Sequence, residues 1–232
     1  MSKQVLVLNS IRGKSGKDTL ISLLESKGYR VHRVAFADIL KKQCASELAF
    51  TSDQAGEFEQ MMHRSVKDDQ LQYLSISNIP DGHYLEWLRG HTDHDHYEAR
   101  SLRWHLQQYG TEYVRNFLGK TDKWLNLGLE EVLKGLQDPK VDMVVVTDCR
   151  LPNELKALEE IRMEPVQDAN LDFVGYIEVV TVRIVREWFI PGVDDQAYHI
   201  SDIALMASHF DHLVVNKLGE PWGMLDQLSG VV

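Results

Sequence analysis

The residues with the clearest chemical meaning lie near the N-terminus, in the run Ile11-Arg12-Gly13-Lys14-Ser15-Gly16-Lys17-Asp18-Thr19. A glycine-rich loop between a strand and a helix can turn successive backbone N–H groups toward a phosphate, and the helix N-terminus adds partial positive charge. The lysine would then reach the β- and γ-phosphates of a nucleotide. We therefore predict a phosphate-binding loop made of Arg12, Gly13, Lys14, Ser15, Gly16, Lys17, Asp18 and Thr19.

This loop keeps part of the G-x-x-x-x-G-K-[ST] pattern and departs from the rest. The second glycine and the lysine are present as Gly16 and Lys17. Ile11 stands at the first glycine position, where a β-branched residue cannot adopt a positive φ without strain. Asp18 occupies the position of the magnesium-binding hydroxyl, and Thr19 follows it. The alternative, a merely flexible turn, is disfavoured by the strand and helix expected on either side.

The elements that must position the loop alternate between strands and helices. Residues 4–8 form a short apolar run typical of a buried parallel strand, and residues 20–24 have the apolar spacing of a helix. Further strands are expected at 31–35, 143–147, 175–185 and 213–216, and helices at 38–48, 98–108, 123–136, 153–161 and 201–208, with a break at Gly110 and a closing helix. The alternation predicts an α/β fold with a parallel sheet and helical crossovers.

Residues 50–98 interrupt this alternation with dense charge and no sustained apolar period, so we expect a partly helical insertion at one edge of a single domain. Histidines and carboxylates gather there and could ligate a transition metal. Because the spacing around positions 94–96 fits no common helical zinc motif, a solvated loop is favoured, and metal binding stays open. The cluster consists of His83, His91, Asp93, His94, Asp95 and His96.

Composition excludes several classes of protein. The 232 residues contain 25 Lys plus Arg and 35 Asp plus Glu, a net charge of −10, which argues against binding to a long nucleic acid but permits a small anion in a basic pocket. No apolar run approaches the roughly 20 residues that span a bilayer, and the first residues lead into a strand rather than a signal peptide. Cys44 and Cys149 suggest neither a disulfide framework nor a zinc site. We expect a cytoplasmic protein.

Five stretches along the chain carry a resemblance to a known family. They are residues 15–19 (S-G-K-D-T), 36–41 (F-A-D-x-L-K), 106–115 (L-Q-x-x-G-T-E-x-x-R), 147–154 (T-D-V-R-F-P-N-E, with two differences) and 199–202 (H-x-S-E, with Asp in last place), followed by Phe210, Asp211, His212 and Asn216. In this order they resemble the deoxynucleoside monophosphate kinases of tailed bacteriophages. The resemblance covers the chain except the insertion, and it departs at Ile11, Val114, Leu151 and Glu187-Trp188.

The resemblance implies a P-loop NTPase-like, doubly wound parallel sheet flanked by helices, with a lid loop at residues 186–199. The implied enzyme transfers the γ-phosphoryl group of ATP to a deoxynucleoside monophosphate. Catalysis then needs only positioning of the substrates and charge neutralisation, because the acceptor oxygen is already anionic and requires no general base. The implied catalytic residues are Lys17, Arg150 and Arg186, and the implied Mg²⁺ ligands are Asp18, Thr19 and Asp148.

Acceptor binding is implied for a larger set of residues. They are Phe36, Asp38, Lys41, Arg103, Gln107, Gly110, Thr111, Arg115, Trp124, Asp148, Arg150 and Glu154, with Glu154 orienting Arg150. Trp124 could stack on a base or simply pack in the core. The accepted bases, modified pyrimidines among them, and the strength of the preference for deoxyribose are left open by the sequence.

The resemblance further implies a role in deoxynucleotide biosynthesis, small-molecule substrates only, a homodimer and, for a phage protein, the cytoplasm of the infected host. Two alternatives stay open. One is another small-molecule P-loop kinase, such as one that phosphorylates dephospho-coenzyme A, although its G-x-x-G-S-G-K-S loop is not present here. The other is a nucleotide-binding switch or scaffold that binds ATP without transferring phosphate.

Overall fold

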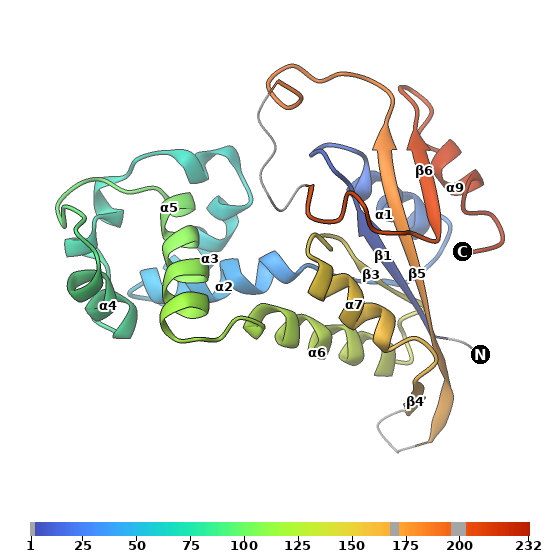
Figure 1. The fold of residues 1–232 in the computed structure, drawn as a ribbon, viewed down its shortest axis with the longest axis horizontal. Coiled ribbons are helices and arrows are strands. Elements are labelled where there is room, and N and C mark those ends of the chain that lie inside the picture. The colour runs from blue at the N-terminus through green and yellow to red at the C-terminus, as the bar shows by residue number, and fades with distance from the viewer. Residues whose placement is uncertain (1–2, 168–171, 196–202) are drawn as a thin grey trace. The chain divides into compact units, whose positions relative to one another are not determined.

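The computed structural model describes residues 3–167, 172–195 and 203–232. These form two compact units (Figure 1). The sheet unit contains Met1–Ala35 and Gly128–Val232, and the helical unit is Phe36–Leu127. The helical unit thus extends on both sides of the expected insertion at 50–98. The motif at 199–202 and the last part of the expected lid, residues 196–199, lie outside the described residues.

The sheet unit has a mostly parallel sheet with flanking helices. Its parallel strands follow the order β2-β3-β1-β5-β6, and they are β1 (Lys3–Asn9), β2 (Val31–Val34), β3 (Met143–Val146), β5 (Phe173–Arg186) and β6 (His212–Asn216). A short strand, β4 (Pro165–Gln167), pairs antiparallel with the beginning of β5. Every residue of β3 is buried, as its continuous apolar sequence predicts for a central parallel strand. These strands confirm the expected α/β class.

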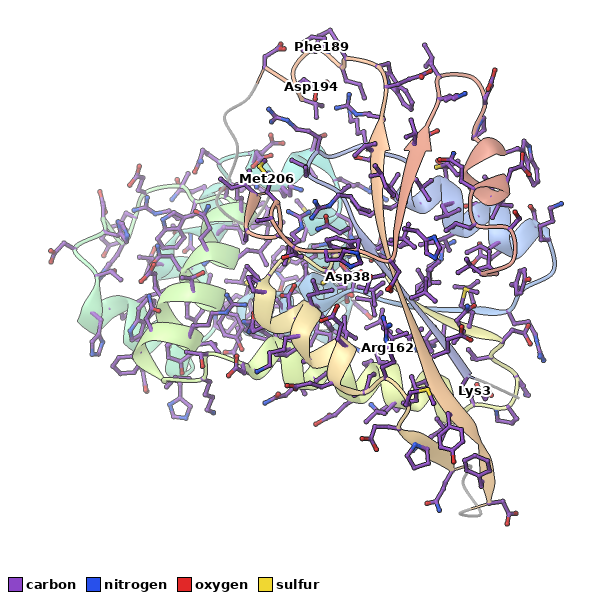
Figure 2. The ribbon with its side chains drawn as sticks, turned by 45° about the vertical axis from the view of Figure 1, so that its right-hand side comes forward. Lys3, Asp38, Arg162, Phe189, Asp194 and Met206 are labelled. Atoms are coloured by element: carbon purple, nitrogen blue, oxygen red, sulfur yellow. The ribbon has the colours of Figure 1, made fainter. Side chains whose placement is uncertain are left out.

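Helices cover both faces of the sheet. The buried residues Leu6 and Leu8 of β1 share one cluster with apolar side chains of α1 (Lys17–Ser26) and α9 (Gly223–Asp226). On the opposite face lie α6 (Lys123–Gln137) and α7 (Pro152–Glu160), side by side in Figures 1 and 2. At Gly135 of α6 a Cβ atom would stand 2.9 Å from Val144 Cγ2, so only glycine allows this close approach to β3.

The parallel strands bring their following loops to one edge of the sheet. β1 ends at Asn9, β3 at Val146, β5 at Arg186 and β6 at Asn216. Because these strands run in the same direction, the segments beginning at residues 10, 147, 187 and 217 all leave the sheet at its carboxyl edge. In open α/β sheets this edge is where ligands bind.

The helical unit is held together by an aromatic core. Its elements are α2 (Phe36–Leu48), α3 (Ser52–Met62), α4 (His83–His91), α5 (Leu102–Gln107), the π-helix η4 (Gln108–Phe117) and the short 3₁₀ turns η1 (Ser65–Asp68), η2 (Gln72–Leu74) and η3 (Ile76–Asn78), with the first residues of α6. Tyr84 lies at the centre, with its ring 5.3 Å from Tyr109 and 5.6 Å from Tyr113. Such tilted and edge-to-face contacts stabilise aromatic pairs beyond the area that they bury.

The break expected at Gly110 is wrong, because the helical backbone continues through this residue as the wider turns of η4. A Cβ at Gly110 would stand only 2.9 Å from Leu40 Cδ2, so glycine serves here for close packing of η4 on α2. Of the helix expected at 201–208, residues 201 and 202 lie outside the described residues, Ile203 is helical and residues 204–207 form a turn. No helix in the described part of the chain is long and apolar enough to cross a bilayer.

Candidate functional site

Residues 10–16, here termed the glycine loop, connect β1 to α1. Gly16 is the residue that precedes α1, and its φ of 100° is one that L residues rarely adopt. Lys14 is also left-handed, with a φ of 57°. Ile11 is not among the positive-φ residues, so the missing first glycine costs no backbone strain in this loop.

Hydrogen bonds inside the glycine loop fix its shape. The hydroxyls of Ser15 and Ser10 both donate to the Arg12 carbonyl, the latter at 3.0 Å. The Lys17 ammonium donates to Ser10 Oγ and therefore lies back over the loop that precedes its helix. A lysine held in this way presents its charge where a loop-bound phosphate would be.

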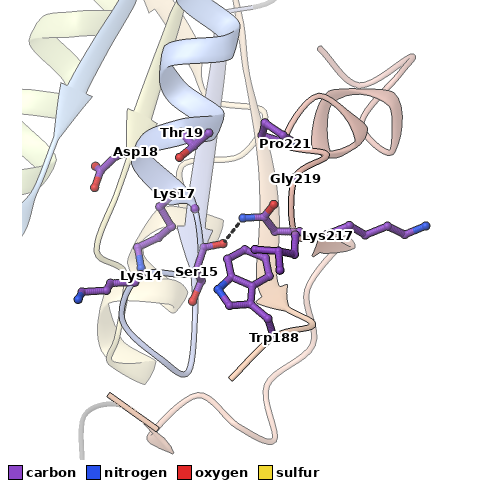
Figure 3. A pocket seen from close by; sticks show the side chains of 12 residues that line it. Lys14, Ser15, Lys17, Asp18, Thr19, Trp188, Lys217, Gly219 and Pro221 are labelled. Carbon is purple, nitrogen blue, oxygen red and sulfur yellow. Dashed lines mark hydrogen bonds between the residues drawn. The ribbon is translucent and has the colours of Figure 1, made fainter. Parts of the chain in front are cut away.

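The last residue of β6 fixes the loop from outside. Asn216 is 5% exposed, and its Nδ2 donates to the Ser15 carbonyl at 3.0 Å (Figure 3). A Cβ on Gly16 would collide with the same Nδ2 atom and stand 3.3 Å from Asn216 Cγ. The glycine and the asparagine therefore fit each other. This pairing could not be predicted from the sequence, because the two residues are 200 positions apart along the chain.

A cavity of about 510 Å³ opens beside the glycine loop (Figure 3). One wall consists of residues 14–19, and the other contains Trp188, Asn216, Lys217, Leu218, Gly219 and Pro221. The first wall offers backbone N–H groups, hydroxyls, two lysines and the Asp18 carboxylate. The second offers an indole ring, the apolar side chains of Leu218 and Pro221, and the polar groups of Asn216 and Lys217. The cavity has the size of a small-molecule site and suits a ligand with both anionic and flat apolar parts.

The segment after β3 carries Asp148, Arg150 and Glu154. Glu154 is 8% exposed, and its Oε2 accepts the backbone N–H groups of Arg150 at 2.8 Å and Leu151 at 3.0 Å. It thus orients the backbone of Arg150 at the start of α7. Asn9, which sequence reasoning missed, donates through Nδ2 to the Cys149 carbonyl at 2.9 Å and so ties this segment to the end of β1. Burial raises the pKa of the Cys149 thiol and keeps it protonated.

The oxygen ligands implied for Mg²⁺ belong to this same unit. Asp18 and Thr19 are exposed in the first turn of α1, and Asp148 is half-buried after β3. Carboxylate and hydroxyl oxygens suit a hard cation that retains several waters, so the donor set fits Mg²⁺ chemically. No group of three or more His, Cys, Asp or Glu residues within the described ranges is arranged to hold a metal, and this includes the segment from His83 to His96.

Two arginines expected to bind phosphate share a carboxylate. The terminal nitrogens of Arg186 donate to both Asp194 oxygens, each at 2.7 Å, and Arg12 Nε lies 3.8 Å from the same carboxylate. The Arg186 side chain is only 4% exposed. These hydrogen bonds hold the pKa of Asp194 below its usual value. Asp194 lies on the loop after β5 (Figure 2), so in this structure the arginines face a carboxylate of their own chain.

Replacing Asp194 with asparagine should strengthen anion binding at this edge of the sheet. The substitution removes the negative charge that Arg12 and Arg186 now face, so tripolyphosphate should bind roughly fivefold more tightly at low salt. Isothermal titration calorimetry measures this directly. Asp195→Asn is the matched control, because it removes the same charge from an exposed neighbouring side chain, which accepts the Gly192 N–H. An equal increase in tripolyphosphate affinity in both variants would contradict the idea that Asp194 competes with the anion for these arginines.

In the helical unit, several acceptor-side residues have partners of their own. Lys41 Nζ lies 2.7 Å from Asp38 Oδ1, and His63 Nε2 lies 3.8 Å from the same oxygen. Arg103 forms a two-point ion pair with Asp68. The structure thus unites two expected residues, Asp38 and Lys41, and adds His63 to them. Gln107 and Thr111 are exposed on α5 and η4.

Other acceptor-side residues are buried. Phe36 and Trp124 are each 3% exposed, and the Trp124 ring lies 6.0 Å from Tyr109, so Trp124 packs in the aromatic core. Within the described residues, the buried Nε1 of Trp124 and Nε of Arg115 have no hydrogen-bond partner. Unpaired buried N–H groups are costly in a folded protein and commonly mark a place where a further acceptor binds.

No protein-family model matches the chain, and no curated protein shows significant similarity to it. The function of the chain is therefore inferred from the glycine loop, the carboxyl edge of the sheet and the basic residues around them.

Proposed function

We propose that this protein is an ATP-dependent deoxynucleoside monophosphate kinase with a P-loop, doubly wound core. The observation that carries the proposal is the glycine loop, to which Lys17, the first residue of α1, bends back and donates a hydrogen bond at Ser10. This is the arrangement that binds nucleotide phosphates in P-loop proteins. The cavity beside the loop has polar groups and an aromatic ring in its walls, which favours a nucleotide over a simple anion as the ligand.

In the proposed reaction an acceptor phosphate oxygen forms a bond to the γ-phosphorus of ATP, and the bond to the β–γ bridging oxygen breaks. The products are ADP and the deoxynucleoside diphosphate. Lys17 and the loop N–H groups hold the β- and γ-phosphates, while Arg150 and Arg186 neutralise charge on the transferred group. Arg186 must exchange Asp194 for phosphate to do so. Mg²⁺, held by Asp18, Thr19 and Asp148, would supply further charge neutralisation when bound.

The acceptor is assigned to residues of the helical unit. Lys41, Arg103 and Arg115 supply positive charge, and the unpaired Nε of Arg115 is a donor that a phosphate oxygen would satisfy. The carboxylates beside Lys41 and Arg103 keep these side chains ordered. Because Trp124 is buried in the core, its contribution is to support η4 through Tyr109 rather than to stack on a base.

The test is phosphoryl transfer by the Lys17→Ala and Arg150→Ala variants. We expect each to lower kcat/KM by roughly a hundredfold or more, since each removes a charge that stabilises the transferring phosphoryl group. A coupled assay of ADP formation should use the four common deoxynucleoside monophosphates, their ribose counterparts, hydroxymethylated pyrimidines and dephospho-coenzyme A. Lys156→Ala is the control, because Lys156 is an exposed lysine on α7 that pairs with Glu160.

Near-normal turnover by a folded Lys17→Ala protein would refute the role of the loop lysine. ADP binding without ADP formation across the whole panel would instead identify a nucleotide-binding switch, and turnover with dephospho-coenzyme A alone would identify the other kinase class. The homodimer, the phage origin and the cytoplasmic location stay predictions from the resemblance.

A further inference from the structure

Trp188 occupies a position that the proposed reaction has not yet used. It lies two residues after the end of β5, is half-buried, and lines the 510 Å³ cavity opposite the glycine loop (Figure 3). It also lines a second cavity of about 340 Å³ together with Arg12, Arg186 and Asp194. The indole therefore stands between the expected phosphate-binding residues and the segment after β6.

The backbone around Trp188 is fixed on both sides. The Arg186 guanidinium donates to the Trp188 carbonyl. The Glu187 N–H donates to the Asn216 carbonyl at 3.2 Å, and the Leu218 N–H donates to Glu187 Oε1 at 3.3 Å. These bonds join the segment carrying Trp188 to the residues that follow β6. Because its backbone is tied in this way, the indole is a built part of the cavity wall and not a side chain on a loose loop.

Apolar side chains extend that wall. Leu218 and Pro221 line the cavity beside the indole, and Figure 3 shows the Lys217 side chain directed away from the glycine loop. Asn216 uses its amide nitrogen to hold the Ser15 carbonyl. A ligand whose phosphates lie on the loop would thus place its other end against a ring and two apolar side chains. A flat heteroaromatic base suits such a surface.

We propose that Trp188 is the stacking surface for the nucleobase of the phosphoryl donor. The identity of this ligand as a nucleotide rests on the proposed function. An aromatic ring binds the π-face that every base possesses and does not read the hydrogen-bonding edge. Purine donors should therefore bind with similar affinities, and the loss of the indole should weaken them all in the same proportion.

The experiment compares ADP, GDP and inorganic tripolyphosphate as probes by isothermal titration calorimetry. Trp188→Leu should lower the affinity for ADP and for GDP by roughly tenfold to a hundredfold and leave the affinity for tripolyphosphate within about twofold of the native value. Trp188→Phe should recover most of the affinity. Trp222→Leu is the control, since Trp222 is a 50% exposed tryptophan of the same unit that does not line this cavity.

If Trp188→Leu weakened the binding of tripolyphosphate as much as the binding of ADP and GDP, the proposal would be overturned. Such a result would show that the indole supports the loop instead of touching a base. Unchanged affinity for ADP and GDP would overturn it as well. Failure of the kinase assay leaves these binding results intact and refutes only the reaction. Conversely, Trp188→Leu could keep both the dNMP-dependent turnover and the ADP affinity of the native protein. That result would refute the stacking role and leave the proposed reaction standing.

Discussion

Replacing Gly16 with alanine should abolish nucleotide binding and destabilise the sheet unit by roughly 3 kcal/mol or more. The φ of 100° at this position strains any L residue, and the added Cβ would collide with Asn216 Nδ2. If Asn216 moves, the Ser15 carbonyl loses its hydrogen bond from a buried amide. The loop would then lose the conformation that turns its N–H groups toward a ligand. Thermal unfolding and calorimetry with ADP measure the two effects.

Gly13→Ala is the matched control in the same loop. No atom lies within 4 Å of a Cβ built at Gly13, and its φ lies outside the left-handed region, so alanine fits there without strain. We expect its stability to change by less than about 0.5 kcal/mol and its ADP affinity to change little. ADP binding by Gly16→Ala at the affinity of the native protein would contradict the fit between Gly16 and Asn216. A large loss in Gly13→Ala would show that the loop depends on flexibility.

The elements around the glycine loop could be predicted because their signals are local. Buried parallel strands such as β1 and β3 are continuous apolar runs, and the amphipathic spacing of Leu20, Ile21 and Leu24 identifies the buried face of α1. The loop lies between these two elements, so its position at the carboxyl edge of the sheet follows from the order of the elements along the chain.

The partners of the site residues could not be predicted, because they come from distant parts of the chain. Asn216 meets Ser15 across 201 positions, and Asn9 meets Cys149 across 140. No periodicity encodes such pairs. One weak signal exists: Asn9 and Asn216 are polar residues at the ends of largely apolar strands, a position where an amide can hold neighbouring loops. A glycine within a helical pattern was similarly ambiguous, and at Gly110 it permits close packing instead of ending the helix.

Some of the acidic residues of this negatively charged chain form ion pairs with basic residues of the proposed site. Acidic side chains lie beside basic residues assigned to substrate binding: Asp194 contacts Arg186 and Arg12, and Asp68 contacts Arg103. Each pair keeps a cation ordered in the absence of an anion. The exposed pair of Asp68 and Arg103 contributes little stability, so a phosphate can replace that carboxylate at small cost. The Arg186 side chain is only 4% exposed, so Asp194 can leave it only when a phosphate takes its place. The same arginines thus pair with carboxylates in the unbound protein and with the phosphate when an anion is bound.

Mild acid should destabilise the helical unit through His105. This side chain is fully buried, and its Nε2 lies 2.7 Å from the Leu74 carbonyl, an acceptor that requires the proton on Nε2. Its Nδ1 then accepts from the Tyr84 hydroxyl at 3.2 Å. Burial, helped by the positive charge of Arg100, lowers the pKa of His105 to about 4, while the unfolded chain has the ordinary value near 6.5.

These two pKa values decide the direction in which pH changes the stability. Above pH 6.5 the ring is neutral in both states and its contribution is complete. As the pH falls from 6.5 to 4, the unfolded chain binds a proton that the folded unit excludes, so the free energy of unfolding drops by up to about 3 kcal/mol. Below pH 4 both states are protonated and the loss levels off. The measurement is urea unfolding at a series of pH values, followed by a signal from the tryptophans of the helical unit.

His105→Gln should remove this part of the pH dependence whatever it does to stability at neutral pH. His83→Gln is the control, because the His83 side chain is 92% exposed. An NMR titration of the native protein gives an independent answer that needs no variant. A His105 pKa near 6.5 in the folded state, or an unchanged slope in His105→Gln, would show that the proton enters this core freely, against the desolvation that its burial imposes.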